Sequence, residues 1–113
     1  MKRVLVINDD RDFQYLMKHY LEREGYSAMT VDDHKPVLKH IEAFDPHLII
    51  LDIQNERDTQ ICKSLREKNI SIPLVLLTDQ EPIEDIRYFA DAIIRKPFQP
   101  HQFLSSIREL MES

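Results

Sequence analysis

Cysteine and glycine are almost absent from this sequence of 113 residues, which contains one of each. The single cysteine, Cys62, excludes a disulfide bond within the chain and fits a reducing compartment such as the cytosol. The single glycine, Gly25, follows a helical pattern, where a left-handed residue that ends the helix is typical. No glycine-rich loop is available to hold a phosphate group, which counts against a flavin-binding protein.

Long apolar runs and an excess of positive charge are also missing. The runs Val4–Ile7 and Leu48–Leu51 are far too short for a signal peptide or a membrane span. The chain has 15 Lys and Arg against 20 Asp and Glu, a formal net charge of −5. Broad binding to nucleic acid or to an anionic membrane needs a basic face. We therefore expect a cytoplasmic protein that contacts neither directly.

Along the chain, short apolar runs alternate with helical patterns, and this alternation occurs five times. Its length predicts a single domain over residues 1–113. Runs that are apolar throughout are typical of strands buried on both faces, so the order predicts an α/β fold with a parallel sheet covered by helices. The predicted strands are residues 4–7, 26–30, 48–51, 74–77 and 92–94.

The helical patterns differ in strength. Large apolar residues from Phe13 to Leu21 recur at the spacing of one helical face. Asp33 is placed to cap the second helix, and Pro100 to open the last one. Between Pro82 and Phe89 there is room only for a short fourth helix.

Polar residues stand where four of the predicted strands end. In open parallel sheets the functional crevice lies at the carboxyl ends of the strands, so these residues are expected to share one edge. They are Asn8, Asp9 and Asp10 after the first strand, Asp52 after the third, Thr78 and Asp79 after the fourth, and Arg95 and Lys96 after the fifth.

The chemistry of this group favours phosphoryl transfer. We expect Asp9, Asp10 and Asp52 to converge, where their mutual repulsion would raise the pKa of each carboxyl group. Mg²⁺ removes that repulsion, because it binds one or two carboxylates, several waters and a phosphate oxygen. Lys96 can pair with Asp52 and later with a phosphoryl oxygen, while Thr78 offers a hydroxyl donor. These are the parts that phosphoryl transfer to a carboxylate requires.

Each residue also has a simpler interpretation. Asp9 and Asp10 can cap the first helix. Asp52 can act as a cap for the loop that comes after the third strand. Threonine is common in strands, so Thr78 alone indicates little. Lys96 alone is typical of a solvated surface. The functional hypothesis therefore depends on their joint placement at four strand ends.

Five segments together resemble response-regulator receiver domains, and the resemblance covers essentially the whole chain. It implies a doubly wound, flavodoxin-like sheet of five parallel strands in the order 2-1-3-4-5. The segments are Lys2–Asp10, Leu21–Tyr26, Asp45–Asp52, Leu77–Thr78 and Lys96–Phe98.

The resemblance also implies roles for single residues in a magnesium-dependent switch of two-component signalling. The chain would not turn over an external metabolite. It would have a sensor histidine kinase or phosphotransfer protein as donor and an effector protein or output domain as target, with a possible homodimer through the fourth helix, fifth strand and fifth helix. The implied roles are phosphoacceptor for Asp52, metal ligands for Asp9, Asp10, Asp52 and the Gln54 backbone carbonyl, a contact through water for Asn8, phosphoryl binding for Thr78 and Lys96, and a cis peptide bond for Lys96-Pro97.

Three departures from the family pattern bear on this expectation. The segment Ile53–Asp58 lacks the usual proline and glycine and is short, and the stretch Asp79–Asp91 lacks about one helical turn. Asp79 puts a carboxylate near the entering phosphoryl group. Ile93 stands where the family has the aromatic partner of the switch residue Thr78, so this coupling is absent or replaced.

These departures leave a degenerate receiver as the alternative, a protein-interaction module that works without phosphorylation. A phosphatase with Asp52 as nucleophile is disfavoured, because Gln54 stands where such an enzyme needs an acid or base.

Overall fold

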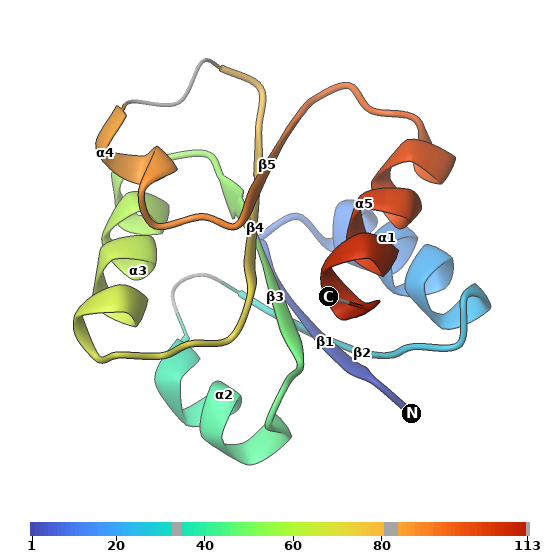
Figure 1. Ribbon diagram of the computed structural model, residues 1–113, viewed down its shortest axis with the longest axis horizontal. Coiled ribbons are helices and arrows are strands. Elements are labelled where there is room, and N and C mark those ends of the chain that lie inside the picture. Colours follow the sequence, from blue (N-terminus) through green and yellow to red (C-terminus); the bar gives the residue numbers. More distant parts are fainter. Residues whose placement is uncertain (33–34, 81–83, 113) are drawn as a thin grey trace.

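The computed structural model describes residues 1–32, 35–80 and 84–112, without the side chains of Glu84 and Asp85. Its centre is a five-stranded parallel sheet in the order β2-β1-β3-β4-β5, which confirms the predicted α/β topology (Figure 1). The strands are β1 (Arg3–Ile7), β2 (Ser27–Val31), β3 (Leu48–Ile53), β4 (Leu74–Thr78) and β5 (Ala92–Arg95).

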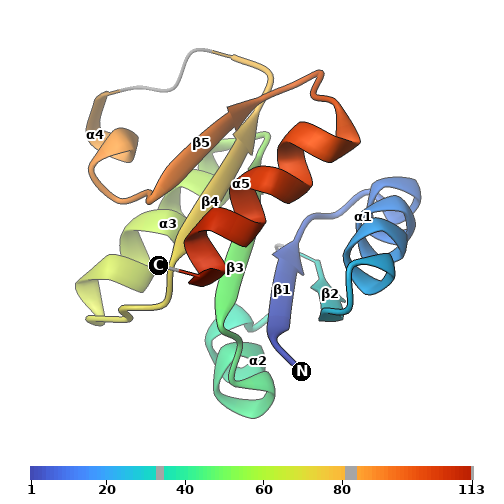
Figure 2. The same ribbon diagram turned by 45° about the vertical axis from the view of Figure 1, so that its right-hand side comes forward.

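Helices cover both faces of this sheet. Helices α1 and α5 lie on one face and α2, α3 and α4 on the other (Figures 1 and 2). None of the helices in the described ranges has the length and apolar character that a bilayer span needs. Their bounds are α1 (Arg11–Arg23), α2 (Val37–Phe44), α3 (Glu56–Glu67), α4 (Glu84–Arg87) and α5 (Pro100–Glu112).

The apolar runs of the three central strands form the core. Side chains of a strand alternate between the two faces of a sheet. In β1, for example, Val4 and Val6 pack with the α1–α5 layer, while Leu5 and Ile7 pack with the α2–α3 layer. All four are fully buried, which is why β1 carries no polar residue from Val4 to Ile7.

All five strands differ from their expected bounds by one or two residues, and two boundaries bear on the site or on a predicted cap. Strand β3 runs past Asp52 to Ile53, because Asp52 and Ile53 pair with Leu77 and Thr78 of β4. Helix α2 begins only at Val37, and its N-cap position is Pro36, which offers no side-chain cap. Asp33, the expected cap, lies outside the described residues.

The short fourth helix is confirmed. Helix α4 is a single turn of four residues, Glu84–Arg87. Pro82, which was expected to start it, lies outside the described residues.

Gly25 ends α1 as expected. Its φ is +93°, in the left-handed region. The Gly25 N–H donates to the Glu22 carbonyl at 3.0 Å, and the Tyr26 N–H donates to the Leu21 carbonyl at 3.1 Å. This is the hydrogen-bond pattern of a Schellman motif, which turns the chain directly into β2.

We predict that Gly25→Ala lowers the free energy of unfolding by about 1–2 kcal/mol, the cost of a left-handed Cβ. The cost is purely conformational, because nothing lies within 4 Å of the position of an added Cβ. Urea unfolding measures it. Gly25→Asn is the control and should lose less, since asparagine tolerates this conformation better. Equal losses for both variants would contradict the explanation.

Candidate functional site

The predicted polar residues meet at the carboxyl edge of the sheet. Asp52 belongs to β3, Asn8 follows β1, and Lys96 follows β5. The register that pairs Ile7 of β1 with Leu51 of β3 sets Asn8 beside Asp52. Parallel strands bring these side chains together because all of their carboxyl ends lie at the same edge.

The Asp52 carboxylate is the buried centre of this group, with 1% of the residue exposed. Lys96 Nζ donates to its Oδ2 at 2.7 Å and lies 2.6 Å from its Oδ1. The Asn8 side-chain amide also donates to Oδ2. Oδ1 accepts no hydrogen bond of suitable geometry. One carboxylate oxygen is thus held by two donors, while the other keeps acceptor capacity.

The environment shifts the titration of Asp52. Burial raises the pKa of this carboxyl group above its ordinary value, because it penalises the charged form. The hydrogen bond and charge of Lys96 and the hydrogen bond from Asn8 oppose that shift, while the negative charge of Asp79 adds to it. The net direction is upward.

Lys96 is not the solvated lysine of the simpler interpretation. Its side chain is 23% exposed, and Nζ lies 4.8 Å from the centroid of the Phe13 ring of α1. Its backbone N–H donates to the Thr78 carbonyl at 2.8 Å. The Lys96-Pro97 peptide bond is cis, as the resemblance implied. Phe13 is a neighbour that sequence reasoning assigned only to the core.

Asp10 has a structural role. Its Oδ1 accepts the N–H groups of Asp12 at 3.0 Å and Phe13 at 3.3 Å, which makes it the N-cap of α1. Among the described residues there is no group of three or more His, Cys, Asp or Glu placed to hold a metal ion. The Asp10 carboxylate caps the helix through Oδ1, and its role as a metal ligand stays a prediction.

The remaining oxygen atoms still fit Mg²⁺. This ion needs only one or two carboxylates and otherwise keeps waters. Asp52 offers a buried oxygen without a hydrogen bond, and Asp9, the second residue after β1, is exposed. The Gln54 carbonyl follows two positions after Asp52. A donor set of hard oxygens suits magnesium rather than zinc or copper.

A capping box holds the short loop after β3. Asp58 Oδ2 accepts the Gln54 N–H at 2.8 Å and the Asn55 N–H at 3.2 Å, and the Asn55 side chain accepts the Asp58 N–H. These bonds fix the loop that lacks the family's proline and glycine. Sequence reasoning missed this box, although an Asn followed three residues later by an acid is a signal for it.

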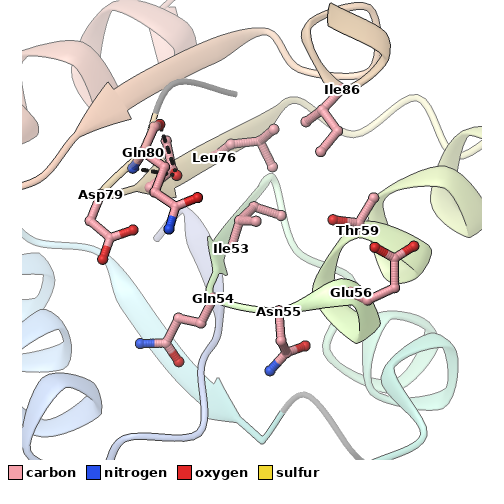
Figure 3. A pocket seen from close by; sticks show the side chains of 10 residues that line it. Ile53, Gln54, Asn55, Glu56, Thr59, Leu76, Asp79, Gln80 and Ile86 are labelled. Carbon is pink, nitrogen blue, oxygen red and sulfur yellow. Dashed lines mark hydrogen bonds between the residues drawn. The ribbon is translucent and has the colours of Figure 1, made fainter. Parts of the chain in front are cut away.

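Thr78 lies on the opposite side of the sheet from the Asp52 pair. Side-chain alternation puts it with Ile53 and Leu76, and together these residues line a hollow of about 190 Å³ (Figure 3). Its hydroxyl donates to the Gln80 carbonyl at 3.1 Å and accepts the Gln80 N–H at 3.1 Å. Ile93, half-buried in β5, packs against the core on the α2–α3 side.

Comparison with known proteins agrees with this geometry. The family model of the response regulator receiver domain matches residues 4–108. The chain belongs to the response regulator receiver domain family. A curated relative is the alkaline phosphatase synthesis transcriptional regulatory protein PhoP of Bacillus subtilis (strain 168), 29% identical over 116 residues. The match covers 97% of this chain and 48% of PhoP, so the receiver domain spans about half of that relative.

Solved receiver structures have the same fold. The response regulator TrrA of Thermotoga maritima, in complex with Mg²⁺–BeF, is 26% identical with a TM-score of 0.86, and the match covers 97% of this chain and 99% of TrrA. The receiver domain of the Francisella response regulator 1452 is 23% identical with a TM-score of 0.88, over 99% and 98% of the two chains. The second likeness concerns the fold alone.

The raised pKa of Asp52 predicts a pH dependence of stability. A buried carboxyl group with a raised pKa stabilises the fold while it is protonated, and this contribution is lost as the pH rises through that pKa. Without metal, the unfolding free energy of Asp52→Asn should therefore increase relative to that of the wild type as the pH rises above 3.8, the ordinary pKa of the group. Urea unfolding in EDTA measures the difference.

Glu22→Gln is the matched control, because Glu22 is exposed near the far end of α1. The difference in unfolding free energy between Glu22→Gln and the wild type should not increase with pH in the same way. A difference between Asp52→Asn and wild type that stays constant or shrinks as the pH rises would contradict the assignment.

Proposed function

We propose that Asp52 is a phosphoacceptor, which takes a phosphoryl group from a sensor histidine kinase or phosphotransfer protein in a magnesium-dependent reaction. The observation that carries the proposal is the buried Asp52 carboxylate, with Lys96 at 2.6–2.7 Å and one oxygen without a hydrogen bond.

The transfer step uses one oxygen of the Asp52 carboxylate as nucleophile. This oxygen attacks the phosphorus of a phosphohistidine in line with the P–N bond. The new O–P bond forms as the P–N bond breaks, and the donor imidazole leaves with the electron pair. Lys96 Nζ, already beside both carboxylate oxygens, stabilises the charge that spreads over the phosphoryl oxygens.

Asp9, Asp52 and the Gln54 carbonyl would hold the magnesium ion, with Asn8 acting through water. Bound Mg²⁺ supplies charge neutralisation and a Lewis acid for a phosphoryl oxygen. Asp10, which caps α1, adds negative charge near the ion. The TrrA complex with Mg²⁺–BeF supports this assignment by relationship.

The product would carry a charge of about −2 on the former Asp52. The Thr78 hydroxyl would then give up its bonds to Gln80 and bind a phosphoryl oxygen. Ile93 has no aromatic ring that could change its rotamer, so it would respond to the movement of Thr78 through its packing. The resulting population shift would reach the face of α4, β5 and α5, where an effector, an output domain or a second copy would read it. The chain acts as a switch and turns over no external metabolite.

Asp79 is a feature of the site that favours a degenerate receiver. Its negative charge adds to the cost of ionising Asp52 and opposes an incoming anion. Lys96 donates a hydrogen bond to the Asp52 carboxylate, and it lowers the pKa of that group more than Asp79 raises it. This balance supports phosphorylation that Asp79 slows but does not prevent.

Incubation with acetyl phosphate tests the proposal by intact mass. We expect the wild type to gain one phosphoryl group with Mg²⁺ and none in EDTA, because the site needs charge neutralisation. Asp52→Asn should gain none, and Glu22→Gln should behave as the wild type. No adduct, or an adduct on Asp52→Asn, would contradict the proposal and favour the degenerate receiver.

Removal of the Asp79 charge should speed the reaction. We expect Asp79→Asn to be phosphorylated about two- to fivefold faster by acetyl phosphate, because one nearby negative charge no longer repels the donor. Glu22→Gln removes the same charge far from the site and should leave the rate unchanged. A rate for Asp79→Asn at or below the wild-type rate would show that Asp79 does not hinder entry.

A further inference from the structure

The two helical layers of the sheet are packed differently. Helices α1 and α5 contact each other, whereas α2 rests on β1 and β2, and α3 rests on β3 and α4. Two hollows of about 500 Å³ each follow the line between α2 and α3. Leu38 lines both hollows, so they form one continuous feature, which we name the α2–α3 groove.

The floor of the α2–α3 groove is apolar. Leu38 of α2 and Ile61 of α3 are only half-buried, although both pack against the core. Val37 and Leu65 continue the floor at one end, and the α3–β4 loop continues it at the other. A partner that covered this floor would remove apolar surface from water, which is the main driving force for association.

The rim of the groove is basic, in contrast to the net charge of −5 of the whole chain. Among the described residues that line it, Glu42 is the one carboxylate. The basic residues are Lys35 and Lys39 beside α2, Arg57 in the first turn of α3, and Lys68 at the end of α3. An apolar floor with a basic rim is complementary to apolar residues flanked by carboxylates.

We propose that the α2–α3 groove docks an acidic amphipathic helix of a partner protein. Helix α3 has 12 residues, about 18 Å, so the groove accommodates roughly three turns of a partner helix. Apolar side chains at i, i+3, i+4 and i+7 lie on the floor, and Glu or Asp beside them meet the rim. The rim charges select the partner and its orientation, while the floor supplies affinity.

Docking of this helix does not depend on phosphorylation. Neither Asp52 nor the groups that bind it line the groove. The groove test and the phosphorylation test can therefore fail separately. Asp52→Asn should bind a docking helix as the wild type does.

A synthetic helical peptide of about 14 residues tests the proposal, with leucine at the four stripe positions and glutamate beside them. Its counterpart has lysine in place of each glutamate. Both are titrated into the ¹⁵N-labelled chain and followed by amide chemical shifts. We expect saturable shifts concentrated in α2 and α3, and an affinity for the acidic peptide at least about tenfold higher than for the basic one.

Two variants separate the contributions of floor and rim. Leu38→Gln should weaken binding of the acidic peptide about tenfold or more, while the spectrum reports whether the fold is intact. Lys39→Glu should weaken the acidic peptide and strengthen the basic one. Lys18→Glu is the matched control, because Lys18 is exposed on α1 and does not line the groove.

Several results would overturn the proposal. One is the absence of saturable shifts in α2 and α3 up to about 1 mM peptide, a weak limit for any specific complex. Another is equal binding of the two peptides, or no effect of Lys39→Glu. Shifts of the same resonances with protein concentration alone would identify a second copy of this chain as the occupant instead.

Discussion

The contact between Asp52 and Lys96 is the interaction on which the site depends. It joins the ends of β3 and β5, which are separated in the sheet by β4 and in the chain by 44 residues. A carboxylate in the interior without a partner costs several kcal/mol, so the loop after β5 must bring a cation to it. The contact of Lys96 with Phe13 and its backbone bond to Thr78 hold that cation in place.

Around this pair, the other groups have divided roles. Asn8 adds a donor to one oxygen, Asp10 is committed to the first helix, and Asp58 fixes the loop that carries Gln54. The negative charge of Asp79 acts on Asp52 from beside this group. The proposed phosphoryl transfer depends on these features.

The two faces of the sheet follow different physical constraints. On one face α1 and α5 pack against each other and cover the core on that side of the sheet. On the other, α4 has a single turn, and α2 and α3 leave apolar side chains half-exposed. The proposed phosphoryl transfer and the proposed docking of a partner helix therefore use separate surfaces, one at the strand ends and one between two helices.

Local patterns in the sequence determined a short fourth helix, the left-handed Gly25 and the place of Asp52 and Lys96 at strand ends, while the strand order came from the resemblance to a family. It did not determine which carboxylates converge. Asp10 could cap a helix or bind a metal, and only the backbone at the start of α1 showed that its Oδ1 caps the helix. The pairing of β3 with β4 sets Thr78 opposite Ile53 rather than Asp52, and the turn after β4 brings its hydroxyl to Gln80. The α2–α3 groove depends on how far two helices stand apart, a distance that packing sets and no residue pattern encodes.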